Sequence, residues 1–302
     1  MLVDTIALAL YKRGREWRER TGVAIHERFF MLRNFELRDR EFLVPDKPYR
    51  LLEGRIVWVK KGSASYAFDL VDHVFSEGDI VVFMGGTLIE KRWHSADFAF
   101  DAVTFESDAV RRKGFVRRRL ATWETDIIET HMKLIWLLVS SAEEHRFPKE
   151  NIHDVTSSLL RQIAPDANNI NNQQDQERGS LTDRFIHLVS LHGATERTVG
   201  FYANRLRLSQ HYLCNKIRSD TGRSVMDWVG EVACKEIAVW LIYSDESIGG
   251  IADRLAYSSV ATMCKFFRRK TGLSPTEYRE ANRLRTTTEV PADELATRCF
   301  KV

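Results

Sequence analysis

The side chains best suited to chemistry in this 302-residue sequence lie in its last third, in two short stretches with the spacing of helix faces. In the first stretch, His211, Cys214, Asn215 and Arg218 recur every three or four residues, which places them on one side of a helix. An Asn amide can make two hydrogen bonds to an adenine edge, and a His can meet a guanine acceptor or a phosphate. This set predicts contact with the bases of a nucleic acid, with Lys216 and Arg218 as phosphate partners.

The second stretch is more basic, and its candidate base-facing side chains are mostly small or apolar. They are Val260, Ala261, Thr262, Cys264 and Lys265. We expect thymine-methyl contact, one polar contact from Lys265 and attraction to the backbone, and therefore weaker sequence selectivity than in the first stretch. The candidate phosphate partners are Arg268, Arg269, Lys270 and Ser274, which begins a helix with free amides. The alternative is that these charges are merely solvated on an exposed helix face.

A helix, a tight turn and a second helix must position the second stretch. Ser247 can cap the first helix, and Ile248, Ile251, Ala252 and Leu255 then follow at helical spacing. Ala252 is small enough for a close helix crossing. The turn at residues 257–259 offers a new cap. Gly272 can end the second helix in the left-handed conformation, and Ser274 to Glu277 has the pattern of a capping box with Pro at the first helical position.

The same skeleton occurs earlier in the chain. Thr198 to Ser209 matches Ser247 to Ser258 with an offset of 49 residues (247 − 198), and Gly222 matches Gly272 with an offset of 50 (272 − 222). One extra residue therefore lies in the second turn region. Between the copies, residues 224–243 predict one long helix that begins with a capping box. Two helix-turn-helix units joined by a stiff helix can enter two successive major-groove segments of double-stranded DNA.

The second unit and its surroundings resemble the AraC/XylS transcriptional regulators. The resemblance covers residues 181–283 strongly and is carried by Ile251, Ala252, Tyr257, Ser258, Phe267, Arg268, Arg269, Gly272, Pro275, Tyr278 and Arg279. Ala256, Tyr257, Met263 and Ile217 depart from the family preference but keep small or apolar character. By alignment, the stretch His211 to Arg218 occupies the family's base-facing positions. The resemblance implies a cytoplasmic DNA-binding regulator, more often an activator, that works with RNA polymerase as a homodimer.

The N-terminal half predicts short strands between Val23 and Phe105, with glycine-rich turns at Gly78 and at Gly85-Gly86. It is similar to the small cupin-type sensor barrel joined to many such regulators, and the fold class we expect is α+β. Trp58, Tyr66, Phe68 and Trp93 line a pocket for a small effector or form plain core.

Residues 119–164 predict two helices. One apolar face is expected from Trp123, Ile127, Ile128, His131, Ile135, Leu138 and Val139. These helices either make a dimer contact or cover the open face of the barrel. The expected domains are residues 1–118 for the sensor, 119–164 for the helical segment, 165–179 for a polar linker, 180–284 for the double helix-turn-helix domain and 285–302 for a tail.

The formal net charge of +3 does not by itself indicate a nucleic-acid partner. The N-terminal apolar run Ile6 to Leu10 precedes its basic residues and is too short to span a bilayer, so we expect neither a secretory signal nor a membrane contact. The four cysteines have no metal-site spacing, which suits free thiols in a reducing cytoplasm.

Two other classes of protein are alternatives to a regulator. Cupin barrels also house metal-dependent enzymes, but His73 and His94 show no paired ligand spacing, so we expect no metal, cofactor or catalytic residue. The second class is an interaction module that has lost DNA binding, against which the basic second unit argues.

Overall fold

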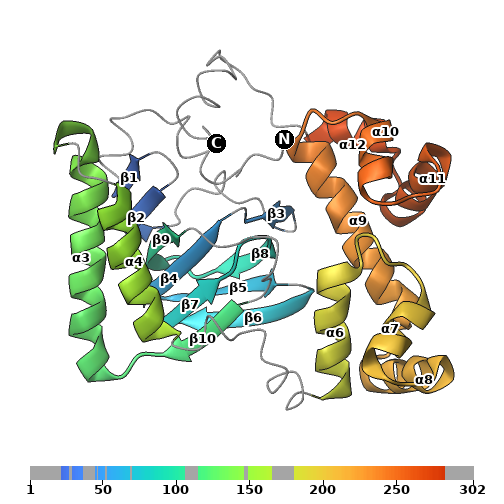
Figure 1. Cartoon of the computed structure of the whole chain (residues 1–302), viewed down its shortest axis with the longest axis horizontal. Coiled ribbons are helices and arrows are strands. Elements are labelled where there is room, and N and C mark those ends of the chain that lie inside the picture. The colour runs from blue at the N-terminus through green and yellow to red at the C-terminus, as the bar shows by residue number, and fades with distance from the viewer. Residues whose placement is uncertain are drawn as a thin grey trace. The chain divides into compact units, whose positions relative to one another are not determined.

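The computed structural model describes residues 22–26, 29–36, 45, 47–51, 53–68, 70–105, 115–145, 149–164 and 180–282. These residues form two compact units, one before and one after the segment 165–179 (Figure 1). The predicted linker at 165–179, the tail at 285–302, the apolar run at 6–10 and Cys299 lie outside the described residues. The predicted boundaries at 118, 164, 179 and 284 stay predictions.

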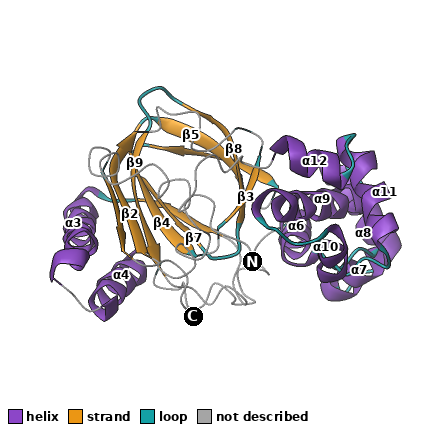
Figure 2. Ribbon diagram, turned by 90° about the horizontal axis from the view of Figure 1, so that it is seen from above, coloured by secondary structure: helices purple, strands orange, loops and turns teal. Residues whose placement is uncertain are grey.

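The N-terminal compact unit contains two antiparallel sheets. The larger has the strand order β1-β2-β9-β4-β7-β10, and the smaller has the order β3-β8-β5-β6 (Figure 2). The strands are β1 (Val23–His26), β2 (Phe29–Glu36), β3 (Pro48–Arg50), β4 (Gly54–Lys61), β5 (Ser63–Phe68), β6 (Val71–Ser76), β7 (Asp79–Phe83), β8 (Leu88–His94), β9 (Ala99–Phe105) and β10 (Phe115–Arg119). The prediction of an N-terminal β region is therefore confirmed. The pairings of the described strands give two sheets and no closed barrel, so closure stays a prediction.

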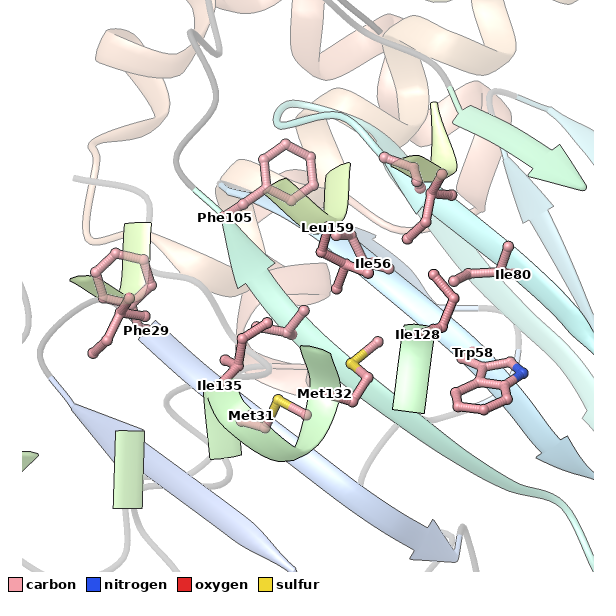
Figure 3. Close-up of a cluster of buried hydrophobic side chains, with 14 of the residues drawn as sticks. Phe29, Met31, Ile56, Trp58, Ile80, Phe105, Ile128, Met132, Ile135 and Leu159 are labelled. Atoms are coloured by element: carbon pink, nitrogen blue, oxygen red, sulfur yellow. The ribbon is translucent and has the colours of Figure 1, made fainter. Parts of the chain in front are cut away.

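The larger sheet has two apolar faces because side chains alternate along each strand. Ile56 and Trp58 of β4 pack against helices α3 (Thr122–His145) and α4 (Lys149–Ile163), together with Met31 of β2 and Ile80 of β7 (Figure 3). The helices contribute Ile128, Met132, Ile135, Val139, Ile152 and Leu159. Burying each such side chain contributes about 1.5–3 kcal/mol, so this cluster holds the two helices on the sheet.

Helix α3 carries two apolar stripes where the sequence predicted one. The stripe toward the sheet contains Ile128 and Ile135, as expected, and also Met132, which the prediction missed. Trp123 is 71% exposed and Ile127 is 40% exposed, so their assignment to that face was wrong. Together with Leu134 and Leu137, they form an outward stripe at intervals of three, four and seven residues.

The C-terminal compact unit is entirely helical among its described residues. Its helices are α6 (Leu181–His192), α7 (Val199–Leu206), α8 (Gln210–Thr221), α9 (Val225–Tyr243), α10 (Ile248–Arg254), α11 (Val260–Thr271) and α12 (Pro275–Asn282). Helix α9 runs between the pair α7–α8 at one end and the pair α10–α11 at the other (Figure 1). Most of its residues are buried, because both pairs pack on it.

The core of the second helix pair has the composition that the sequence predicted. Ile237 and Leu241 of α9 meet Ile251, Ala252 and Phe267 in one buried cluster. Ala252 is 1% exposed, which agrees with the expectation of a close helix crossing at a methyl side chain. The predicted long helix over residues 224–243 is likewise confirmed as α9.

Candidate nucleic-acid interface

Short-range hydrogen bonds set the ends of the helices in both helix-turn-helix units, as predicted. Ser247 Oγ accepts from the amide of Gly250 at 2.9 Å, and Ser259 Oγ accepts from the amide of Thr262 at 3.2 Å. Gly272 ends α11 with φ 79°, a left-handed conformation that glycine adopts without steric cost. These caps fix where α11 begins and ends, and therefore which of its side chains face outward.

The internal repeat holds in three dimensions, with one refinement. Thr198 and Ser247 cap the first helices, and Gly222 and Gly272 end the second ones. The turns differ: Ser209 caps α8, whereas its counterpart on α11 is Ser259. The pairing of Ser209 with Ser258 was therefore wrong at this position, because the extra residue of the second turn lies before the cap.

Helix α8 presents the predicted polar stripe to the outside. His211, Asn215 and Arg218 are exposed, while Cys214 at the edge of the stripe is half-buried. The amide Nδ2 of Asn215 lies 3.0 Å from Nε2 of His211. Leu213 and Ile217 on the opposite side are fully buried, so α8 cannot turn its stripe inward without exposing core.

Helix α11 presents the equivalent stripe in the second unit. Ala261, Thr262, Lys265 and Arg268 are exposed, Val260 is 41% exposed and Cys264 is half-buried. Met263 and Phe267 anchor the inner side. The helix carries four cations and no acid, whereas α8 carries two cations and one acid, Asp220. The outward face of α11 is therefore the more strongly basic one.

Three of the expected phosphate partners are engaged within the chain. Lys216 Nζ forms an ion pair with Asp220 at 2.8 Å, and this bond raises the pKa of the lysine. The stem of Lys270 packs toward Gly230 of α9. The amide of Ser274 donates to the carboxylate of Glu277 at 2.7 Å, and the pKa of that carboxyl is lowered by the Ser274 hydroxyl and amide. A phosphate would have to compete with these contacts, whereas Arg218, Arg268 and Arg269 have exposed side chains.

Arg197 joins the two helix-turn-helix units and was missed by the sequence prediction. It lies one residue before the cap of α7, yet its guanidinium donates to the carbonyls of Leu255 and Ala256 at the end of α10, at 2.8 and 2.5 Å. The same group lies 3.9 Å from the centre of the Tyr257 ring. Nothing in the local sequence pattern indicates this contact, because its partners lie nearly 60 residues further along the chain.

The described cysteines and histidines show no metal-site geometry. Cys214, Cys234 and Cys264 are free and half-buried, and burial raises the pKa of Cys234 to about 11. His73 packs edge-on against Phe115 at 4.5 Å, and His94 bonds the carbonyl of Ser95 at 2.9 Å. No group of three or more His, Cys, Asp or Glu within the described residues could hold a metal ion.

The N-terminal compact unit contains an apolar cavity of about 80 Å³ between its two sheets. Val57 of the larger sheet and Tyr66 and Phe68 of the smaller sheet line it, and Arg55 is a charged lining residue. Of the four aromatic residues expected to line a pocket or to form plain core, Trp58 lies in the core cluster with the helices, as the second alternative has it. Trp93 is 47% exposed and does neither.

Comparison with known proteins matches the helical part of the chain to a domain family. Residues 202–281 match a family model described as a helix-turn-helix domain. The uncharacterized HTH-type transcriptional regulator YtdP of Bacillus subtilis (strain 168) is 25% identical over 171 residues, which is 54% of this chain and 22% of that protein. Residues 202–281 therefore match a helix-turn-helix domain family, and the chain is similar over 171 residues to a transcriptional regulator. It spans about a fifth of the length of YtdP.

Three solved structures are similar in part. The C-terminal domain of AraT, a response regulator from Geobacillus stearothermophilus, is 21% identical, with 38% of this chain and 97% of that one covered and a TM-score of 0.35. The DNA-binding domain of AdpA with a target DNA is 26% identical, with 36% and 97% covered and a TM-score of 0.33. Wild-type ToxT from Vibrio cholerae strain SCE256, solved with an unsaturated fatty acid, is 14% identical, with 89% and 96% covered and a TM-score of 0.38.

The matched model and the relative agree with the resemblance stated from the motif, since both are of the helix-turn-helix type. Within the part of the chain that the structure describes, no helix is long and apolar enough to cross a bilayer.

Proposed function

We propose that the chain binds double-stranded DNA in a sequence-dependent way, with α8 and α11 entering two successive major-groove segments. The observation that carries this proposal is the pair of outward stripes, one on each second helix, presented by two equivalent units packed on α9. A major groove admits one α-helix, and adjacent entries on one side of the duplex lie about 34 Å apart.

The two helices contribute differently to this proposed binding. His211 and Asn215 offer hydrogen bonds to base edges, so α8 carries most of the sequence selectivity. Helix α11 offers small side chains to thymine methyl groups and relies on Lys265, Arg268 and Arg269 for attraction to the backbone. Lys216, Lys270 and Ser274 are the weaker phosphate candidates, because intramolecular partners or packing already engage them.

Selection of bound sequences from a random DNA pool tests the proposal. We expect one recovered motif with two conserved segments about one helical turn apart, of which the α8 segment is the more strictly specified. Binding should weaken steeply as salt rises, because phosphate contacts release counterions. Recovery of no sequence preference at any salt concentration would contradict sequence-specific binding. A motif with a single short segment would contradict the proposal that both helices enter the groove.

We further propose that the outward stripe of α3 is a homodimer contact. Trp123, Ile127, Leu134 and Leu137 expose apolar surface along one line, which a second copy can cover with its own stripe. An antiparallel pairing centred near Thr130 brings Asp126 of one copy beside Lys133 of the other, so charge also favours this arrangement. Covering the stripe leaves α3's inner face on the sheet unchanged.

The mass of the full chain in solution tests the dimer. We expect a dimer by sedimentation, and a shift to monomer in Leu137→Glu, because a charge in an apolar contact is left unpaired. Lys133→Glu should also weaken the pairing, and Asp126→Lys combined with it should restore the dimer. A wild-type chain that stays monomeric at all concentrations would contradict this proposal and would leave DNA binding by one chain intact.

The cavity of the N-terminal compact unit supports a sensor role for the predicted cupin-like barrel. Its apolar lining suits a small, largely apolar effector. Filling it by Val57→Phe should abolish any rise in melting temperature that such an effector produces in the wild type, while leaving DNA binding without effector intact. By family resemblance, we propose that the bound protein acts with RNA polymerase, as an activator, in the cytoplasm where the chromosome lies.

A further inference from the structure

The two helix-turn-helix units are joined by more than α9. The segment 193–198, which connects α6 to α7, crosses to the second unit. There Arg197 donates one hydrogen bond to Leu255 O at 2.8 Å and one to Ala256 O at 2.5 Å, and it donates a third to Ala194 O in its own segment, also at 2.5 Å. The fork geometry of the guanidinium permits these bonds at once, whereas a lysine could not reproduce them.

The segment that carries Arg197 is itself held tightly. A Cβ added at Gly193 would lie 3.0 Å from Cβ of Val232 on α9, so this part of the segment lies directly on the central helix. Ala194 packs against the core cluster of the second unit. One residue after Arg197, Thr198 caps α7, the first helix of the first unit. The start of one unit is thereby attached to the turn of the other.

The partners of Arg197 lie at a functionally sensitive place. Leu255 is the C-cap of α10, and Ala256 begins the turn whose other end is the cap of α11 at Ser259. Carbonyls at the end of a helix carry partial negative charge, which favours a cation there. The ring of Tyr257 completes the contact at 3.9 Å from the guanidinium carbon.

We infer that Arg197 is a positioning residue that fixes the spacing and twist between the two recognition helices α8 and α11. With α9 alone, bending or torsion of one helix would let the units move relative to each other. The cross-connection at Arg197 adds a second attachment beside α9 and opposes that motion. A rigid pair accepts only DNA sites whose two segments have one separation, so Arg197 determines site spacing without touching a base. This inference rests on the proposed DNA binding.

A spacing series measures the effect. Inserting or deleting one base pair between the two segments moves one of them by about 3.4 Å and turns it by roughly a tenth of a helical turn. We expect the wild type to bind such altered sites about tenfold or more weakly than the native spacing. Arg197→Ala should reduce that penalty to about threefold or less, while its affinity for DNA that carries only the α8 segment stays unchanged. Arg197→Lys should fall between the two.

Arg223→Ala is the matched control. Arg223 also lies over an aromatic ring, 4.1 Å from the centre of Trp228, and pairs with Glu231 at 2.5 Å, but these contacts lie within the first unit and α9. We expect this variant to keep the wild-type spacing penalty. An equal loss of the penalty in both variants would mean general loosening and would overturn the positioning role, as would an unchanged penalty in Arg197→Ala.

A second measurement needs no DNA and keeps the inference testable if DNA binding fails. Spin labels on cysteines introduced at the exposed positions Ser219 of α8 and Thr276 of α12, in a chain with its native cysteines replaced by serine, report the distance between the units. The distribution should be narrow in the parent and clearly broader in Arg197→Ala. Equal widths would overturn the inference and leave the proposed DNA binding untouched.

Discussion

The left-handed backbone positions of the two units allow a stability prediction that depends on one physical effect. Gly272 has φ 79°, and a Cβ added there would have no heavy atom within 4 Å. Gly272→Ala therefore introduces backbone strain without a steric clash from neighbouring residues. Ala256, at the turn after α10, already bears this strain with φ 52°. The two substitutions Gly272→Ala and Ala256→Gly should therefore act in opposite directions.

The magnitude follows from two opposing terms. A side chain in the left-handed region costs about 1–2 kcal/mol in the folded state. Alanine also restricts the unfolded chain, which offsets about 0.4–1 kcal/mol of that cost. The net loss for Gly272→Ala is then about 0.5–1 kcal/mol, and Ala256→Gly should stabilise by a similar amount. For a helical unit of about 100 residues, this corresponds to a melting-temperature change of about 2–8 °C.

Hydrogen exchange of the full chain, read on peptides of α10 to α12, resolves the second unit from the rest. Gly272→Ala should speed exchange in α11, and Ala256→Gly should slow it. Gly222→Ala is the matched substitution in the first unit, where φ is 70° and an added Cβ again has no neighbour within 4 Å, so it should affect α8 instead. Stabilisation by Gly272→Ala, or destabilisation by Ala256→Gly, would refute the strain argument.

Three further outcomes can be measured on the same chain. Asn215→Ala should cost about 1–3 kcal/mol of binding and relax one base position, as measured on a panel of single-base variants of the selected site; a larger loss of selectivity from Cys264→Ala would reverse the proposed ranking of the helices. Arg268→Ala should weaken all sequences alike and reduce the slope of log affinity against log salt by about one. Burial opposes ionisation of Glu129, but the hydrogen bond from Lys60 at 2.8 Å and the charge of Arg33 lower its pKa on balance. Because this pKa is lowered in the folded state, the contribution is present at neutral pH and is lost as pH falls below 4.5; urea unfolding should show this loss in the wild type and a smaller one in Glu129→Gln.

The sequence carried enough information to predict the helix-turn-helix units almost in full. Caps at Ser247 and Thr198, the glycine stops at Gly222 and Gly272, and the buried position of Ala252 all depend on residues within one or two helical turns. Residue type and spacing indicate such short-range requirements directly. The outward stripes of α8 and α11 could be predicted for the same reason, since helical periodicity fixes one face once the opposite face is known to be apolar.

Other features depended on which distant segments meet, and there the sequence was insufficient. Periodicity predicted that α3 is apolar but not that Ile128 faces the sheet while Trp123 faces outward, because both stripes have helical spacing. The pairing of the described strands into two sheets follows from register between strands far apart in the chain. The same register decides that Trp58 faces the helices.

The sequence by itself thus determined that the helices α8 and α11 exist and which side chains they show to the outside. Only the tertiary structure decided how they are held, because the bonds from Arg197 to the carbonyls of Leu255 and Ala256 join residues nearly 60 positions apart. Every residue has a backbone carbonyl, so the sequence does not indicate which carbonyls accept the hydrogen bonds of Arg197.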